Sequence, residues 1–232
     1  VRYFLSDREI PFAGHPTIAT AMSLTSRSKH DKNKLVFETL AGLIHVEVSC
    51  SGDQTKISMT QPKPKFGLKI EKKVLSQIGG IPENSILCKP QVVSTGLPFP
   101  IVLVDTLETL QKVTIDYQAL DKFRATSSEN DLMEPFWVCL SSPRENGITF
   151  SRLLLQSAGR SEDPFTGSAT GAMAAYLWDN GLIQEPTFTA HQGDFLGRPG
   201  EAEVEVLGRL GNISGVKVTG SAYILMTGKL KI

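Results

Sequence analysis

The chain has 232 residues, of which 41% are hydrophobic and 21% are charged, an ordinary balance for a globular protein. Lysine plus arginine (24) equals aspartate plus glutamate (24), so no net field favours nucleic acid or an anionic membrane as a partner. No apolar run approaches the roughly 20 residues that a membrane-spanning helix needs.

The first half of the chain predicts a strand, a loop, a helix and then a run of strands. Residues 1–5 are strand-like, 6–16 form a loop rich in proline and glycine, and 16–26 suit a helix with proline in its first turn. Later elements are strands at 35–40, 43–48, 56–59, 92–95 and 101–104, a proline-rich interruption at 61–66, and a helix at 71–78. Because Val1 opens directly into a strand, we expect a segment before it.

The second half repeats the same kinds of element. Helices are expected at 117–125 and 168–180, the second ended by Gly181 as a left-handed cap. Strands are expected at 136–140, 148–154, 188–191, 201–206, 213–218 and 223–226. Strands and helices do not alternate regularly, so the pattern predicts an α+β protein with mostly antiparallel strands around each helix.

Two segments of the chain are near-copies of each other. Residues 9–21 and 162–174 match at an offset of 153, and 37–42 match 188–193 at an offset of 151. The identical pairs in the longer match are Glu9/Glu162, Pro11/Pro164, Phe12/Phe165, Gly14/Gly167, Thr17/Thr170, Ala19/Ala172 and Ala21/Ala174. The repeat predicts two similar lobes, 1–92 and 93–232, with the last strand free to pack on the other lobe. Each lobe brings one helix N-terminus to a cleft between them.

The positions that differ between the copies carry the chemistry. Ile10 is replaced by Asp163, and His15 by Ser168. A histidine and an aspartate that converge on one cleft are typical of proton transfer, and helix N-termini supply N–H groups for an anion. Each residue also has a structural interpretation: Ser168 as an N-cap, Asp163 as a turn former, and His15 as a satisfied structural histidine.

The positions shared by both copies predict a scaffold. The repeated prolines fix φ, the phenylalanines anchor the loops, and Gly14 and Gly167 allow close backbone approach. Glu9 and Glu162 occur in both halves, which favours loop-tethering hydrogen bonds over a one-sided catalytic role.

The sequence offers no cofactor or metal motif. Neither loop matches a phosphate-binding or dinucleotide-binding glycine pattern, and no Gly-x-Ser-x-Gly elbow is present. The histidines lack metal-ligand spacing. Cys50, Cys88 and Cys139 form no Cys-x-x-Cys pair, so we expect free thiols in a reducing cytoplasm.

The motifs Pro11-Phe-Ala-Gly-His-Pro-Thr17 and Glu162-Asp-Pro-Phe-Thr-Gly-Ser168, followed by His191-Gln-Gly193 and Gly197-Arg198-Pro199, resemble those of the PhzF-like (phenazine biosynthesis-like) family. The resemblance covers nearly the whole chain. It implies the diaminopimelate epimerase-like fold, in which a bent sheet wraps a central helix in each of two lobes. The implied activity is cofactor-independent isomerisation of a small carboxylated substrate between the lobes, and a homodimer is plausible.

The resemblance also implies site residues. His15 and Asp163 match the family's catalytic histidine and aspartate, and Gly14, Gly167 and Ser168 match its substrate-binding neighbours. The family's principal glutamate base would lie before Val1. Related racemases carry a thiol at each helix N-terminus, and the cysteines here lie elsewhere. The alternative function is a catalytically silent homologue that binds a small molecule or a protein.

Overall fold

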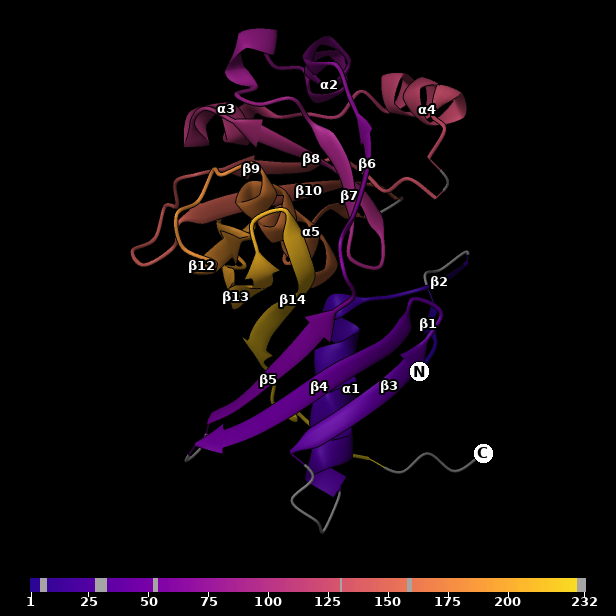
Figure 1. Cartoon of the computed structure of the whole chain (residues 1–232), viewed down its shortest axis with the longest axis vertical. Coiled ribbons are helices and arrows are strands. Elements are labelled where there is room, and N and C mark those ends of the chain that lie inside the picture. The colour runs from indigo at the N-terminus through magenta and orange to yellow at the C-terminus, as the bar shows by residue number, and fades with distance from the viewer. Residues whose placement is uncertain (5–7, 28–32, 52–53, 130, 158–159, 229–232) are drawn as a thin grey trace.

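The computed structural model describes residues 1–4, 8–27, 33–51, 54–129, 131–157 and 160–228. Two lobes stand one above the other, joined by strands that run between them (Figure 1). None of the helices in these ranges has the length and apolar character that crossing a bilayer would take.

The first lobe is a three-stranded antiparallel sheet that curves around one helix. Its elements are β1 (Tyr3–Phe4), β2 (Glu9–Ile10), α1 (Gly14–Arg27), β3 (Lys34–Thr39), β4 (Gly42–Ser51) and β5 (Gln54–Gln61). Alternate residues on the strands are buried, as the two-residue period of a half-exposed sheet requires. The cross-strand pairs Phe37↔Ile44 and Val46↔Met59 place four of these apolar side chains in the core.

The second lobe wraps a longer curved sheet around α5 (Gly167–Asp179). The residues of α5 from Gly167 to Leu177 are all buried, so this helix lacks a polar face and has to lie inside the sheet. The other elements are β6 (Lys65–Lys69), α2 (Lys72–Gly79), η1 (Glu83–Ser85), β7 (Gln91–Ser94), β8 (Pro98–Val104), α3 (Leu107–Lys112), α4 (Tyr117–Thr126), β9 (Phe136–Cys139), β10 (Thr149–Ser157), β11 (Arg160–Asp163), β12 (Thr187–Gln192), η2 (Asp194–Leu196), β13 (Gly200–Arg209) and β14 (Asn212–Ser221).

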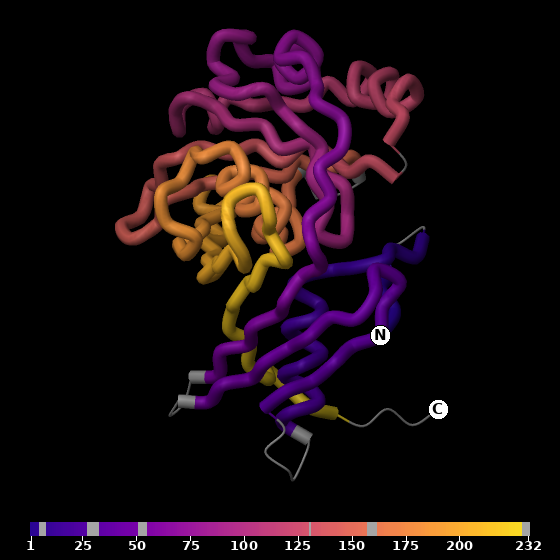
Figure 2. Tube along the Cα trace, in the orientation of Figure 1, coloured from indigo at the N-terminus to yellow at the C-terminus, as the bar shows by residue number. Residues whose placement is uncertain are grey.

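One continuous sheet connects the lobes, in the order β3-β4-β5-β14-β13-β12-β10-β9-β8-β7-β6, with β11 paired to β10. The β8–β9 and β10–β12 pairs are parallel and the rest are antiparallel. Figure 2 shows the end of the chain leaving the second lobe and running along β5 of the first. There β14 pairs with β5 from Val216↔Gln61 to Ser221↔Lys56. The expected α+β architecture, with bent sheet around a central helix in each lobe, is confirmed, and the two bent regions belong to one sheet.

The residues between β6 and β7 pack with the second lobe. β6 pairs with β7, and Leu75 and Ile78 of α2 share a core with Trp137 and Phe150. This second core lies on the outer face of the sheet, away from α5. We therefore propose that the lobes divide between β5 and β6 rather than at the 92/93 boundary expected from the sequence.

Some local expectations were wrong. Residues 223–226 form no strand, and Tyr223, Leu225 and Met226 are exposed. Helix α1 begins at Gly14, before the expected start at 16. The expected proline-rich interruption at 61–66 overlaps the start of β6, and α3 was not expected at all. Its N-cap Thr106, whose hydroxyl accepts the N–H of Thr109, accounts for it.

Candidate functional site

The two helix N-termini meet at the repeated glycines. A Cβ added to Gly14 would lie 2.9 Å from the backbone nitrogen of Ser168 and 3.0 Å from the Cα of Gly167. A real side chain does not tolerate such contacts with backbone, so only glycine allows α1 and α5 to approach this closely. The structure thus brings Gly14, Gly167 and Ser168 together, as the repeat predicts.

Each repeated phenylalanine fixes its loop against another glycine. Phe12 is fully buried, packs edge-on against Tyr3 with 6.2 Å between ring centroids, and would clash with any side chain at Gly96. Phe165 is half-buried and covers Gly200 in the same way. The anchoring role expected for these rings is consistent with this packing.

The repeated glutamates each receive a two-pronged arginine contact. Arg2 Nε and Nη2 donate to Glu9 at 2.9 and 2.7 Å, and Arg152 Nε and Nη2 donate to Glu162 at 3.0 and 2.7 Å. Arg2 is exposed, whereas both side chains of the second pair are largely buried. The remaining Arg152 nitrogen, Nη1, donates to the carbonyls of residues 110, 111 and 113 at the end of α3. Both glutamates tether their loops, as expected from their repetition.

Asp163 lies at the end of β11, where a small hydrogen-bond network holds it. Its carboxylate Oδ2 accepts the Thr166 hydroxyl at 2.7 Å, and its carbonyl accepts the Gln192 side-chain amide at 2.7 Å. Oε1 of Gln192 accepts the backbone N–H of Thr166 at 3.1 Å. Neither Thr166 nor Gln192 is among the site residues predicted from the sequence, although both belong to motifs that carry the family resemblance.

His15 and Ser168 are the second residues of α1 and α5. His15 is exposed, and Ser168 is 7% exposed. Ser168 is not the N-cap of α5: that position is Thr166, whose side chain makes no capping bond. Across the described ranges, no hydrogen bond or ion pair joins His15 to Asp163, so the structure places these two side chains at neighbouring loops without direct contact.

A side chain from the first lobe reaches the N-terminus of α5. Gln61, at the end of β5, is fully buried, and its Nε2 donates to the carbonyl of Gly167 at 2.8 Å. The Thr95 hydroxyl donates to Gln61 Oε1. A Cβ on Gly171 would occupy the place of the Gln61 amide, so this glycine makes room for the contact. Gln61 and Gln192 therefore hold the same loop from two sides.

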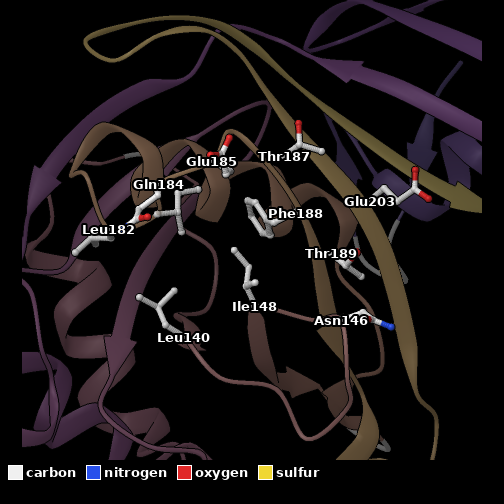
Figure 3. A pocket seen from close by; sticks show the side chains of 11 residues that line it. Leu140, Asn146, Ile148, Leu182, Gln184, Glu185, Thr187, Phe188, Thr189 and Glu203 are labelled. Carbon is white, nitrogen blue, oxygen red and sulfur yellow. The ribbon is translucent and has the colours of Figure 1, made fainter.

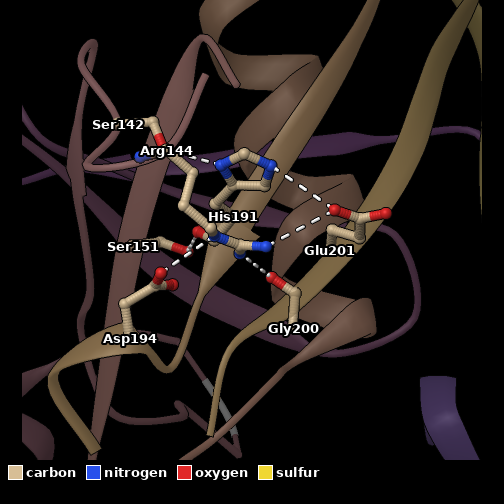
Figure 4. Close-up of polar contacts among 7 residues, drawn as sticks. All are labelled: Ser142, Arg144, Ser151, His191, Asp194, Gly200 and Glu201. Carbon is tan, nitrogen blue, oxygen red and sulfur yellow. Dashed lines mark hydrogen bonds and ion pairs between the residues drawn. The ribbon is translucent and has the colours of Figure 1, made fainter. Parts of the chain in front are cut away.

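A buried histidine, His191, lies next to Arg144, which contacts both ends of the loop that follows Gln192 (Figure 4). Nδ1 of His191 lies 2.6 Å from the Ser142 hydroxyl, and its Nε2 lies 3.8 Å from Glu201. Burial lowers the pKa of His191, and the Arg144 guanidinium lowers it further. Glu201 and Asp194 raise this pKa, but by less. Arg144 itself donates to the carbonyl of Gly200 and contacts Asp194 at 2.8 Å.

A cavity of about 730 Å³ lies in the second lobe, away from these loops (Figure 3). Its walls are mostly apolar, with Leu140, Ile148 and Phe188 among them, and none of the predicted site residues lines it. No group of three metal-ligating side chains occurs in the part of the chain that the structure describes. The candidate groups for the site at the two helix N-termini are backbone N–H groups, the Ser168 hydroxyl, the His15 imidazole and the Asp163 carboxylate.

The chain is similar to known proteins over nearly its whole length. The sequence model of the family described as phenazine biosynthesis-like protein matches residues 1–228. An uncharacterized isomerase of Clostridium acetobutylicum is 31% identical over 99% of this chain and 78% of its own length. The trans-2,3-dihydro-3-hydroxyanthranilate isomerase of Pseudomonas fluorescens is 27% identical over 99% and 78%. A solved structure described as a predicted epimerase of Pseudomonas aeruginosa superposes with a TM-score of 0.76 at 26% identity, over 97% and 79%.

Proposed function

Because the chain belongs to the phenazine biosynthesis-like family, we propose that it is a cofactor-independent isomerase that moves a proton within a small carboxylated substrate bound between the lobes. Relatives named as isomerases support the reaction class. The observation that carries the proposal is the meeting of two helix N-termini at Gly14 and Gly167.

Two helix N-termini that meet at one point favour the binding of a negatively charged group there. Each N-terminus carries a partial positive charge of about half an elementary unit together with unpaired N–H groups. Bringing two such ends into contact is unfavourable unless an anion lies beside both of them. A substrate carboxylate, or the enolate-like charge that develops when a proton leaves the neighbouring carbon, supplies that anion.

The proposed roles follow from the chemistry of each group. Gly14, Gly167 and Ser168 bind the substrate anion through backbone N–H groups and a hydroxyl. Asp163 and His15, on opposite loops, act as partner acid–base or orienting groups for the proton transfer at the substrate. Both side chain types exchange protons under mild conditions, and positioned acid–base groups contribute typically 10²–10⁴-fold to a rate.

The test is proton exchange with solvent. The full-length protein would be incubated with trans-2,3-dihydro-3-hydroxyanthranilate in D₂O, and deuterium incorporation and product formation would be followed by NMR. We expect enzyme-dependent incorporation that falls about 10²-fold or more in Asp163→Asn. Asp179→Asn is the matched control, because this exposed carboxylate lies at the other end of α5. Binding of the compound without any exchange would contradict the isomerase and favour a silent binding protein.

A further inference from the structure

The loop that carries Asp163 is closed by a ring of hydrogen bonds among Asp163, Thr166 and Gln192. The Gln192 amide donates to the Asp163 carbonyl and lies 3.3 Å from the Thr166 hydroxyl, while its oxygen accepts the Thr166 N–H. The Thr166 hydroxyl bonds Asp163 Oδ2 at 2.7 Å. Gln192 is fully buried and Thr166 is 7% exposed, so water competes little for these bonds.

The direction of each bond follows from the atoms available. An ionised carboxylate accepts hydrogen bonds and donates none, so the single Thr166 hydroxyl proton is directed at Asp163. The lone pairs of that hydroxyl then face the Gln192 amide, which can only donate. Oδ2 of Asp163 is thereby held inside the loop. No hydrogen bond to Oδ1 occurs among the described residues, and Oδ1 is the oxygen left for a substrate proton.

The first copy of the repeat shows that this ring is not required by the fold. The positions that match Asp163, Thr166 and Gln192 hold Ile10, Ala13 and Ala41. There the strand, loop and helix still form, and the backbone N–H of residue 41 donates to the carbonyl of residue 11 at 3.2 Å instead. The three polar side chains that form the ring therefore occur only in the second copy of the repeat.

We propose that Thr166 is a positioning residue that fixes the Asp163 carboxylate in one orientation, and that Gln192 fixes Thr166 in turn. The inference rests on the proposed function, because it gives the orientation of Asp163 a purpose in proton transfer. A carboxylate that rotates freely spends part of its time with neither oxygen aimed at the substrate, and small misplacements of a reacting group cost rate rather than binding.

The test uses two substitutions at Thr166, one that removes the hydroxyl and one that retains it. Thr166→Val keeps the shape and removes the hydroxyl, whereas Thr166→Ser keeps it. With trans-2,3-dihydro-3-hydroxyanthranilate as the substrate, we expect Thr166→Val to lower kcat about tenfold with KM nearly unchanged. Thr166→Ser should remain within about threefold of wild type, since the donor to Asp163 is retained.

A second threonine of α5 separates positioning from stability. The Thr170 hydroxyl is also buried, but it donates to the backbone carbonyl of Thr166 at 3.0 Å. Thr170→Val should lower the unfolding temperature without lowering kcat. Thr166→Ala, which installs the residue found at the matching position of the first copy, gives a second variant without the hydroxyl.

A double substitution identifies the route of the effect. If Thr166 acts through Asp163, adding Thr166→Val to Asp163→Asn causes no further loss of kcat. A further tenfold loss, or wild-type kcat in both Thr166→Val and Thr166→Ala, would overturn the positioning role. These outcomes differ from failure of the proposed function, which would appear as unchanged activity in Asp163→Asn itself.

Discussion

Replacing Gly14 with alanine tests the close approach of the two helices. The added methyl group would lie about 3 Å from three backbone atoms of Gly167 and Ser168, and backbone inside a packed lobe moves with difficulty. Overpacking of this kind costs roughly 1–3 kcal/mol. Alanine recovers about 0.4–1 kcal/mol because it restricts the unfolded chain. The net expectation is a loss of about 1–2 kcal/mol in the free energy of unfolding.

Gly167→Ala is the matched control, because Gly167 occupies the same position in the second copy. Its new methyl group would meet the terminal carbon of Met59 at 3.3 Å and the Cα of Gly14 at 3.6 Å. The tip of a methionine moves readily, so this substitution should be nearly neutral. The two chemically identical changes are therefore expected to differ in stability.

Thermal unfolding of the purified variants measures this difference. At this chain length a loss of 1 kcal/mol lowers Tm by about 2–4 °C, so Gly14→Ala should unfold about 2–8 °C below wild type. Gly167→Ala should stay close to wild type. The close approach of the helices would be refuted if Gly14→Ala were as stable as wild type, or more stable than Gly167→Ala.

Two further predictions concern residues that support the site loops. Arg152→Met should cost about 3–5 kcal/mol in urea unfolding, because it leaves Glu162 buried without its partner. Arg2→Met, at the exposed equivalent, should cost far less, and equal losses would contradict the difference in burial. Burial lowers the pKa of His191 below its ordinary value of 6.5, so the unfolded chain binds the proton more readily. The free energy of unfolding that neutral His191 contributes is present above pH 6.5 and falls as the pH drops below that value. Wild type should therefore lose more stability than His191→Gln between pH 7 and pH 5. Equal losses in the two proteins would show that His191 is not responsible.

Several features of the site could be predicted because they depend on short segments of the sequence. The repeat places Gly14 and Gly167 at equivalent points, and a glycine at the start of each helix implies the same geometry in both copies. The contrast between Ile10 and Asp163 identifies the lobe that carries the carboxylate. The hydrogen bonds around Asp163 were not predictable in this way, because Gln192 lies 29 residues from it and reaches it only through the β10–β12 pairing.

The sequence by itself determined the α+β class, the duplicated loops and the buried central helix, since each depends on residue spacing along one segment. Only the tertiary structure decided which strand-like segments pair with a neighbouring strand. Residues 223–226 have a strand-like composition and no neighbouring strand, whereas β6 follows two prolines and is held by β7. The same holds for β14, which joins the lobes by pairing with β5 about 160 residues earlier. A strand is stable only when its N–H and C=O groups meet those of another strand, and that condition is set by the closure of the whole fold.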